Sequence, residues 1–415
     1  MKKRALLSVF VKDGILELAQ YLKEADWEIL STGGTAKYLT ENNIPVTDVS
    51  AVTGFPECLD GRVKTLHPAI HAGVLAIRDN KEHMDKIAEL GVAPIDLVCV
   101  NLYPFFEKVQ AGLKFEETVE FIDIGGPTMI RAAAKNFQDV IVLTDPADYA
   151  ETISGLKAGN VPFEFRRKLA GKVFNLTSAY DAAVSRFMLE DELPTYYDMP
   201  LVKSQSLRYG ENGHQKAALY VTADKKGAFS GMTQLQGTEL SYNNIRDLDV
   251  AWKAVCAFNT FVKNASPVNG TDFSGYEGII CGKDANGEKA APQGTPITAS
   301  FGGAASSVFT VALKHNTPCG ASLGKTALES YKQTYDCDPV SIFGGIVGCS
   351  ATVDKEAAEE MVKCFLEVIV APDFTEDALK VFETKKNLRI VKAEIDANDD
   401  YEVMSVAGGL LVQNK

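Results

Sequence analysis

Apolar residues along the first 150 positions alternate between the spacing of strands and the spacing of helices. The continuous apolar run at 5–11 is typical of a strand buried on both faces, and residues 15–22 then follow helical spacing. Further buried strands are predicted at 27–30, 95–102 and 140–143. Strands that alternate with helices predict a largely parallel sheet covered by helices, so the fold class is α/β.

Helical spacing also marks three later segments. Residues 84–90 place apolar side chains on one helical face. A Gly-Gly-Pro sequence at 125–127 predicts the start of a helix that reaches Lys135, with Pro127 at its first position. Residues 163–192 lack turn signals, so they predict one or two further helices.

The length of 415 residues and the changes of pattern divide the chain into three parts. We expect a first α/β domain over 1–150, a helical bridge and linker over 151–200, and a second α/β domain over 201–415. Residues 264–307 are rich in Gly, Ala, Ser, Thr, Asn and Pro, and they predict a loop insertion in the second domain.

Composition disfavours several classes of protein. A hydrophobic content of 46% argues against disorder, and a net charge of −13 gives no support to nucleic-acid or membrane-surface binding by the chain as a whole. The eight cysteines form no C-x-x-C pair, which indicates reduced, buried residues and no metal site. Lys12 and Asp13 directly follow the first apolar run, which favours a buried strand over a signal peptide. No run is long enough for a membrane helix, so we expect a cytoplasmic protein.

Three polar sequences in the first domain suit a phosphorylated ligand. The first, Ser-Thr-Gly-Gly-Thr at 31–35, follows a predicted strand and precedes a helix. Glycines let the backbone approach a ligand closely, and a helix start offers unpaired N–H groups and a positive dipole end. Taken alone, this sequence could also be an ordinary strand–helix turn.

The second and third sequences add to this signal. Residues 122–128 repeat the Gly-Gly turn and lead to Arg131 and Lys135, which share a helical face that could equally be a solvated basic face. Residues 61–68 bring together Arg62, Lys64 and His67. Three such elements in one α/β domain favour a phosphorylated ligand.

These motifs resemble a known family. Residues 31–35 and 61–68, Asn-Leu-Tyr-Pro-Phe at 101–105 and Asp-Ile-Gly-Gly at 123–126 have the order and spacing of the IMP cyclohydrolase domain in the bifunctional AICAR transformylase/IMP cyclohydrolase family. The resemblance implies a methylglyoxal-synthase-like parallel-sheet domain. It also implies closure of the pyrimidine ring of formyl-AICAR to give IMP: the carboxamide nitrogen attacks the formyl carbon, and water leaves.

Ring closure requires no metal. It requires contact between the reacting groups, stabilisation of a developing oxyanion and proton relays. The resemblance assigns these catalytic roles to Lys64, Tyr103, Asp123 and Lys135. Together with the Gly-Gly turn, it assigns the nucleotide pocket to Lys12, Thr32, Gly33, Gly34, Thr35, Arg62, Thr65, Asn101, Gly125 and Gly126. Asp123 could instead cap a helix, and Tyr103 could be a core ring.

The second domain resembles the first part of a transformylase domain, which implies a partial cytidine-deaminase-like α/β fold. The matching sequences begin at Arg208-Tyr209, Leu240, Lys314-His315 and Glu367. The family transfers a formyl group from 10-formyltetrahydrofolate, its co-substrate, to the amine of AICAR. A neutral histidine can accept the amine proton while a neighbouring ammonium keeps it neutral and stabilises the oxyanion.

The resemblance therefore makes Lys314 and His315 catalytic, and it makes Arg208, Tyr209, His214 and Asn244 contacts of AICAR. Without it, Lys314-His315 would be an unremarked surface dipeptide. A homodimer is also implied. Family members continue well past the equivalent of Lys415, so we expect the C-terminal part of the transformylase domain to be missing and formyl transfer to require a separate complementing segment.

Two other functions remain open on the sequence alone. A non-catalytic, nucleotide-binding regulatory module would use the same phosphate-binding loops. The joint presence of Lys64, Tyr103, Asp123 and Lys135 favours catalysis over that alternative. Methylglyoxal synthase chemistry on dihydroxyacetone phosphate is disfavoured by the long second domain and by the sequence at 61–68.

Overall fold

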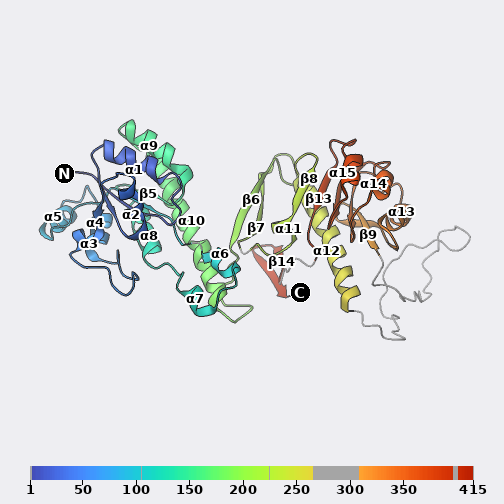
Figure 1. Ribbon diagram of the computed structural model, residues 1–415, viewed down its shortest axis with the longest axis horizontal. Coiled ribbons are helices and arrows are strands. Elements are labelled where there is room, and N and C mark those ends of the chain that lie inside the picture. The colour runs from blue at the N-terminus through green and yellow to red at the C-terminus, as the bar shows by residue number, and fades with distance from the viewer. Residues whose placement is uncertain (1, 104, 224, 265–307, 396–400, 415) are drawn as a thin grey trace, which may run out of the picture. The chain divides into compact units, whose positions relative to one another are not determined.

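The computed structural model describes residues 2–103, 105–223, 225–264, 308–395 and 401–414 (Figure 1). The chain divides into two compact units, Met1–Pro200 and Leu201–Lys415. Almost all of the predicted insertion at 264–307 lies outside the described residues. Within the described residues, no helix has both the length and the apolar character needed to cross a bilayer.

The first unit contains a five-stranded sheet in the order β3-β2-β1-β4-β5, and every neighbouring pair of strands is parallel. The elements of this unit are β1 Arg4–Ser8, α1 Ile15–Glu24, β2 Glu28–Ser31, α2 Gly33–Glu41, β3 Thr47–Asp48, α3 Val49–Thr53, α4 Pro68–Leu75, α5 Lys81–Glu89, β4 Leu97–Val100, α6 Phe105–Gln110, α7 Phe115–Val119, α8 Gly125–Lys135, β5 Ile141–Leu143, the 3-10 turn Pro146–Asp148, α9 Tyr149–Lys157 and α10 Phe163–Met188.

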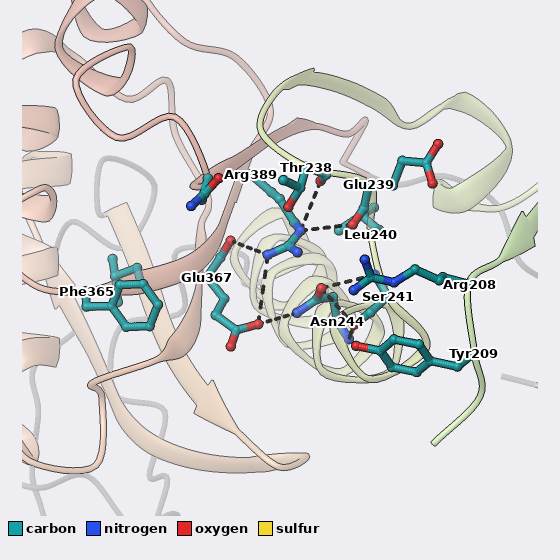
Figure 2. Close-up of a pocket in the computed structure, with 12 residues that line it drawn as sticks. Arg208, Tyr209, Thr238, Glu239, Leu240, Ser241, Asn244, Phe365, Glu367 and Arg389 are labelled. Atoms are coloured by element: carbon teal, nitrogen blue, oxygen red, sulfur yellow. Dashed lines mark hydrogen bonds and ion pairs between the residues drawn. The ribbon is translucent and has the colours of Figure 1, made fainter. Parts of the chain in front are cut away.

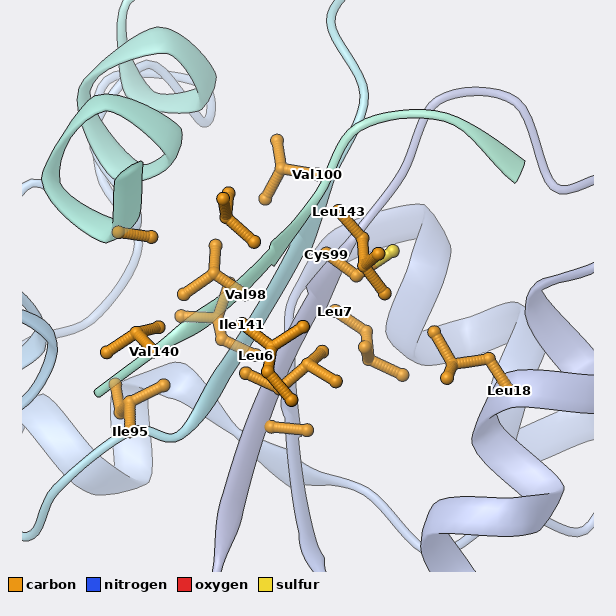
Figure 3. Close-up of a cluster of buried hydrophobic side chains, with 14 of the residues drawn as sticks. Leu6, Leu7, Leu18, Ile95, Val98, Cys99, Val100, Val140, Ile141 and Leu143 are labelled. Atoms are coloured by element: carbon orange, nitrogen blue, oxygen red, sulfur yellow. The ribbon is translucent and has the colours of Figure 1, made fainter. Parts of the chain in front are cut away.

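The core of the first unit forms because its strands are apolar on both faces. Leu6, Leu7, Val98 and Cys99 are essentially inaccessible to solvent, and Figure 3 shows Leu7 on the side of Leu18 of α1 and Val98 on the other side of the strands. Burial of such side chains contributes about 1.5–3 kcal/mol each. The predicted parallel sheet of an α/β fold is confirmed.

Several predicted boundaries in this unit differ from the structure; the strand predicted at 95–102, for example, is Leu97–Val100. Two of the differences have a visible cause. The strand predicted at 5–11 ends at Ser8, because the backbone of Val9 bonds to the Thr35 hydroxyl and the N–H group of Val11 donates to Asn101. Pro127 is the third residue of α8 and not the first, because the helix begins at Gly125.

The segment predicted as a helical bridge is integral to the first unit. Helix α10 is one continuous helix. Its residues Phe165, Leu169 and Val173 are buried in the same core as the parallel sheet. Helical spacing predicted α10 correctly, but only packing reveals where its apolar face is buried.

The second unit contains a six-stranded mixed sheet in the order β10-β9-β11-β12-β13-β8 and two separate hairpins, β6-β7 and β14-β15. Its elements are β6 Leu201–Leu207, β7 Ala217–Thr222, α11 Ala228–Gly231, β8 Thr233–Gln236, α12 Tyr242–Asn264, β9 Val308–Lys314, β10 Thr317–Gly324, α13 Ala327–Cys337, β11 Gly345–Cys349, α14 Lys355–Met361, β12 Leu366–Ala371, α15 Glu376–Phe382, β13 Arg389–Lys392, β14 Tyr401–Val406 and β15 Gly409–Asn414.

Alternating side chains give the mixed sheet two buried faces. Val368 and Val370 of β12 pack with Trp252 of α12 on one face, whereas Ile369 packs with Met361 of α14 on the other. A strand that is apolar on both faces therefore lies between two helical layers. Strand β6 begins at Leu201, the residue at which the second domain was predicted to begin.

Candidate active sites

The loops that follow the parallel strands of the first unit carry most of the predicted site residues. Lys12 follows β1, the residues at 31–35 end β2 and begin α2, and Asn101 follows β4. Carboxyl ends of parallel strands meet at one edge of a sheet, where α/β proteins bind ligands. The fold therefore gathers at one edge three segments that are distant in sequence.

Hydrogen bonds hold these loops against one another. The Lys12 ammonium donates to the Thr35 hydroxyl at 3.2 Å and to the carbonyl of Phe10 at 3.3 Å. Asn101 accepts from the N–H group of Val11 at 3.1 Å and donates back to its carbonyl at 3.0 Å. Burial lowers the pKa of Lys12. These contacts build one rim of the candidate site.

Lys64 lies against two glycines. Its Nζ atom would stand 3.3 Å from a Cβ atom at position 33, and a Cβ atom at Gly61 would approach the same ammonium at 2.9 Å. Both glycines have positive φ angles, 53° and 89°, which disfavour other residues. Glu57 pairs with the Lys64 ammonium at 3.1 Å. The phosphate-suited start of α2 thus lies directly beside the predicted catalytic lysine.

Asp123 lies two residues before the start of α8. Its side chain accepts hydrogen bonds from two backbone N–H groups. Its Oδ1 atom accepts from Gly126 at 2.8 Å, and its carboxylate also accepts from the backbone of Tyr103. Burial raises the pKa of Asp123, although both hydrogen bonds oppose the rise. The expected helix-capping contact is present, and the structure brings Asp123 to Tyr103 as well.

Tyr103 is not a core ring. Its side chain is 44% exposed and meets the ring of Phe10 edge to face, with 5.5 Å between the centroids. Its backbone contact with Asp123 leaves the phenol itself available to solvent or a ligand. The core alternative for Tyr103 is therefore wrong.

Other predicted residues lie apart from this cluster. Arg62 forms an exposed ion pair with Glu120. Lys135 is exposed at the last residue of α8, about 15 Å from Gly125 along the helix axis at 1.5 Å per residue. Thr65, in contrast, lies beside Gly125, since a Cβ atom there would be 3.2 Å from the Thr65 hydroxyl.

In the second unit, Lys314 is the last residue of β9, and His315 is the first residue of the turn that joins β9 to β10. His315 and Asn316 both have positive φ angles, 56° and 59°, as a two-residue hairpin turn requires. The carboxylate of Asp247 on α12 accepts from their N–H groups at 3.2 and 2.6 Å. The Lys314 ammonium donates to the carbonyl of Phe343 at 2.8 Å. The turn is thus held from α12 by Asp247, and the strand end beside it is held by the carbonyl of Phe343.

The second unit contains a cavity of about 630 Å³, and several of its recognised sequence motifs contribute lining residues (Figure 2). Arg208, Tyr209 and Asn244 line it, whereas Lys314, His315 and His214 do not. Phe365 connects the two regions, since it lines the cavity and packs against Phe343, whose carbonyl holds Lys314. Of the predicted AICAR contacts, the structure brings three to one cavity.

Two lining residues were missed by the sequence analysis. Figure 2 shows Glu367 between Asn244 and Arg389: Asn244 donates to Glu367 at 2.7 Å, and Arg389 lies 3.9 Å from the same carboxylate oxygen. Arg389 also donates to the carbonyls of Thr238 and Glu239. Glu367 begins a recognised motif, so a signal existed for it; Arg389 opens a short strand and carries no local signal.

Each unit therefore carries its own polar site, and the two define a two-domain α/β enzyme whose first domain has a purely parallel sheet. Comparison with known families gives two matches, and the boundary between them falls within α8 of the first unit. The MGS-like domain matches residues 14–128, and the AICARFT/IMPCHase bienzyme matches residues 133–271 and 291–415.

Curated relatives match over the whole chain. "Bifunctional purine biosynthesis protein PurH" of Clostridium acetobutylicum is 54% identical over 415 residues, which are all of this chain and 74% of the relative. The proteins with the same description from Clostridium botulinum strain Loch Maree and from Clostridium kluyveri are 53% and 52% identical, again over 74% of their length. A chain described as the crystal structure of ForH is 38% identical, with a TM-score of 0.41, and is matched over 45% of this chain and 99% of that one.

This chain belongs to the AICARFT/IMPCHase bienzyme family. The family predicted from the motifs and the MGS-like fold of the first domain are confirmed. Purine biosynthesis by a bifunctional enzyme is likewise confirmed as the function, and no finding favours the non-catalytic alternative.

Proposed function

We propose that the first unit closes the ring of formyl-AICAR at a site formed by Lys64, Tyr103 and Asp123. The observation that carries this proposal is the half-buried Asp123 carboxylate, held by the N–H groups of Tyr103 and Gly126. Burial raises the pKa of Asp123, which favours uptake of a proton by its carboxylate.

The chemistry divides among these residues. Asp123 accepts the proton of the carboxamide nitrogen as that nitrogen attacks the formyl carbon. The Lys64 ammonium stabilises the oxyanion that develops on the formyl oxygen, a contribution of about 3–4 kcal/mol for one well-placed donor. The departing oxygen takes up two protons and leaves as water: one is the proton held by Asp123, relayed by the exposed phenol of Tyr103, and the other is the proton that the formamide nitrogen loses as the new C=N bond forms.

The remaining residues of the first unit bind the nucleotide in this proposal. The start of α2, with its N–H groups and dipole, binds the phosphate beside Lys64. Arg62 exchanges Glu120 for an anionic group of the nucleotide. The wider pocket consists of Lys12, Thr32, Gly33, Gly34, Thr35, Thr65, Asn101, Gly125 and Gly126. Lys135 stays a predicted catalytic residue, with the least geometric support because it lies at the far end of α8.

For the second unit we propose formyl transfer from 10-formyltetrahydrofolate to AICAR. The cavity lined by Arg208, Tyr209 and Asn244 supports AICAR binding, because its two arginines, Arg208 and Arg389, suit an anionic nucleotide. Lys314 and His315 are the proposed catalytic pair, and His214 is a proposed contact.

We also propose a homodimer, which sedimentation of the purified chain tests.

A crosswise assay tests both proposals. Lys64→Ala should lower IMP formation from formyl-AICAR by about a hundredfold or more. It should leave formyl transfer unchanged when that activity is assayed with the expected complementing segment present. Lys314→Ala should do the reverse. Lys81→Ala is the matched control, because the Lys81 side chain is 88% exposed and pairs with Asp85 on the surface. Unchanged cyclisation in Lys64→Ala would contradict the first site, and loss of both activities in either variant would contradict the division of labour.

A further inference from the structure

Tyr180 on α10 is a buried tyrosine that contacts Asp123 of the candidate site. The sequence analysis did not predict it as a site residue. Its hydroxyl accepts a hydrogen bond from the N–H group of Asp123 at 2.8 Å and donates one to the carbonyl of Phe121 at 3.2 Å. The residue is only 3% exposed. One hydroxyl therefore closes the turn 121–123 that leads into α8.

The ring of Tyr180 also approaches the second segment of the site. It lies 5.9 Å from the ring of Phe105, centroid to centroid, and Phe105 bonds through its N–H group to the carbonyl of Tyr103. Phe105, beside Tyr103, and Phe121, beside Asp123, thus both contact the Tyr180 side chain. Helix α10 itself is anchored in the core by Phe165, Leu169 and Val173.

Asp123 is consequently fixed on both sides. Its carboxylate is held by the N–H groups of Tyr103 and Gly126, and its own peptide N–H is held by Tyr180. The two sets of contacts act on different atoms of the same residue. Loss of the Tyr180 hydroxyl would leave a part-buried N–H donor without its partner, and the turn could then rotate to find water.

We propose that Tyr180 is a positioning residue for ring closure, whose hydroxyl fixes the backbone of Asp123 so that the carboxylate faces Tyr103. This inference rests on the proposed role of Asp123. Tyr180 does not touch the reacting groups itself. Its effect on the reaction is transmitted through the peptide of Asp123.

Tyr180→Phe in the full chain isolates this effect, because it keeps the ring beside Phe105 and removes only the hydroxyl. The matched control is Tyr149→Phe, another buried tyrosine of the same unit, whose hydroxyl accepts from the Cys99 thiol at 3.2 Å. The measurements are kcat and KM for formyl-AICAR, with the melting temperature of each variant.

Tyr180→Phe should lower kcat by about ten- to a hundredfold, the range for one hydrogen bond lost from a buried donor, and leave KM nearly unchanged. Tyr149→Phe should retain the wild-type kcat, even if its melting temperature falls as far. A purely structural role for Tyr180 would lower the melting temperature without the change in kcat, and that result would overturn the inference.

Asp123→Asn separates this inference from the proposed site. If Tyr180 acts through Asp123, the double variant Asp123→Asn/Tyr180→Phe should be no slower than Asp123→Asn alone. Effects that multiply would overturn the positioning role. Normal turnover in Asp123→Asn would instead refute the proposed site, whereas a slow Asp123→Asn with a normal Tyr180→Phe would refute only the role of Tyr180.

Discussion

Asp247→Ala should release the turn that carries Lys314 and His315. The Asp247 carboxylate extends from α12 and accepts two backbone N–H groups of the turn, one from His315 and one from Asn316. Both of these residues have positive φ angles. The substitution removes the acceptors and leaves the strained backbone without compensation.

The magnitude follows from these contacts. A hydrogen bond to a charged group contributes about 1.5–3 kcal/mol. The bond to His315 is exposed and long at 3.2 Å, so the shorter bond to Asn316, at 2.6 Å, should dominate. A left-handed backbone costs roughly 1–2 kcal/mol for a residue other than glycine. We therefore expect Asp247→Ala to lower the free energy of unfolding of the second unit by about 2–3 kcal/mol.

Urea unfolding followed by tryptophan fluorescence measures this change. Trp27 lies in the first unit and Trp252 in the second, so a Trp27→Phe background makes Trp252 the reporter of the second unit. Asp249→Ala is the matched control on the same helix. It breaks a part-exposed ion pair with Lys253, and such a pair contributes about 0.3–0.5 kcal/mol.

Asn316→Gly provides a rescue, because glycine adopts a positive φ angle without strain. In the Asp247→Ala background it should restore about 1 kcal/mol of stability. Asp247→Ala should also reduce formyl transfer more than it reduces ring closure in the first unit. A loss of stability no larger than that of Asp249→Ala would refute the reasoning.

Two further predictions concern the first unit. Gly126→Ala should strongly impair ring closure, because a Cβ atom at position 126 would lie 2.4 Å from an Asp123 carboxylate oxygen; Gly171→Ala, which meets no atom within 4 Å, should keep full activity. Lys172 bonds to Asp145 and thereby lowers the pKa of Asp145. This stabilisation should be complete above the unfolded pKa of about 4 and disappear as the pH falls through the lower folded pKa, so Lys172→Met should flatten the acid limb of a stability–pH curve.

Sequence patterns correctly predicted the helices that are determined by neighbouring residues in the chain. The Gly-Gly turn at 125–126 correctly marked the start of α8, and apolar periodicity correctly predicted α1 and α10. Periodicity could not predict the end of β1, because the side chain that replaces its ladder partner, Asn101, lies 90 residues away from Val11.

The same distinction applies to the sites. Recognised motifs identified Asp123, Lys64 and Lys314, since each stands in a distinctive sequence. The residues that hold these site residues in place do not stand in distinctive sequences. Asp247 lies 68 residues from His315, and Tyr180 lies 57 residues from Asp123. Both appear in the sequence only as polar residues of an amphipathic helix, so their contacts emerge from the packing of those helices.

The turnover of formyl-AICAR by Asp123→Asn, measured beside the binding of IMP, tests the central claim most directly. The amide keeps the size of the carboxylate and can still accept from Gly126, so IMP should bind with nearly unchanged affinity. It cannot take up the proton, so kcat should fall by about 10²–10⁴-fold, the usual contribution of general acid–base catalysis. Wild-type turnover with intact IMP binding would contradict the proposed site.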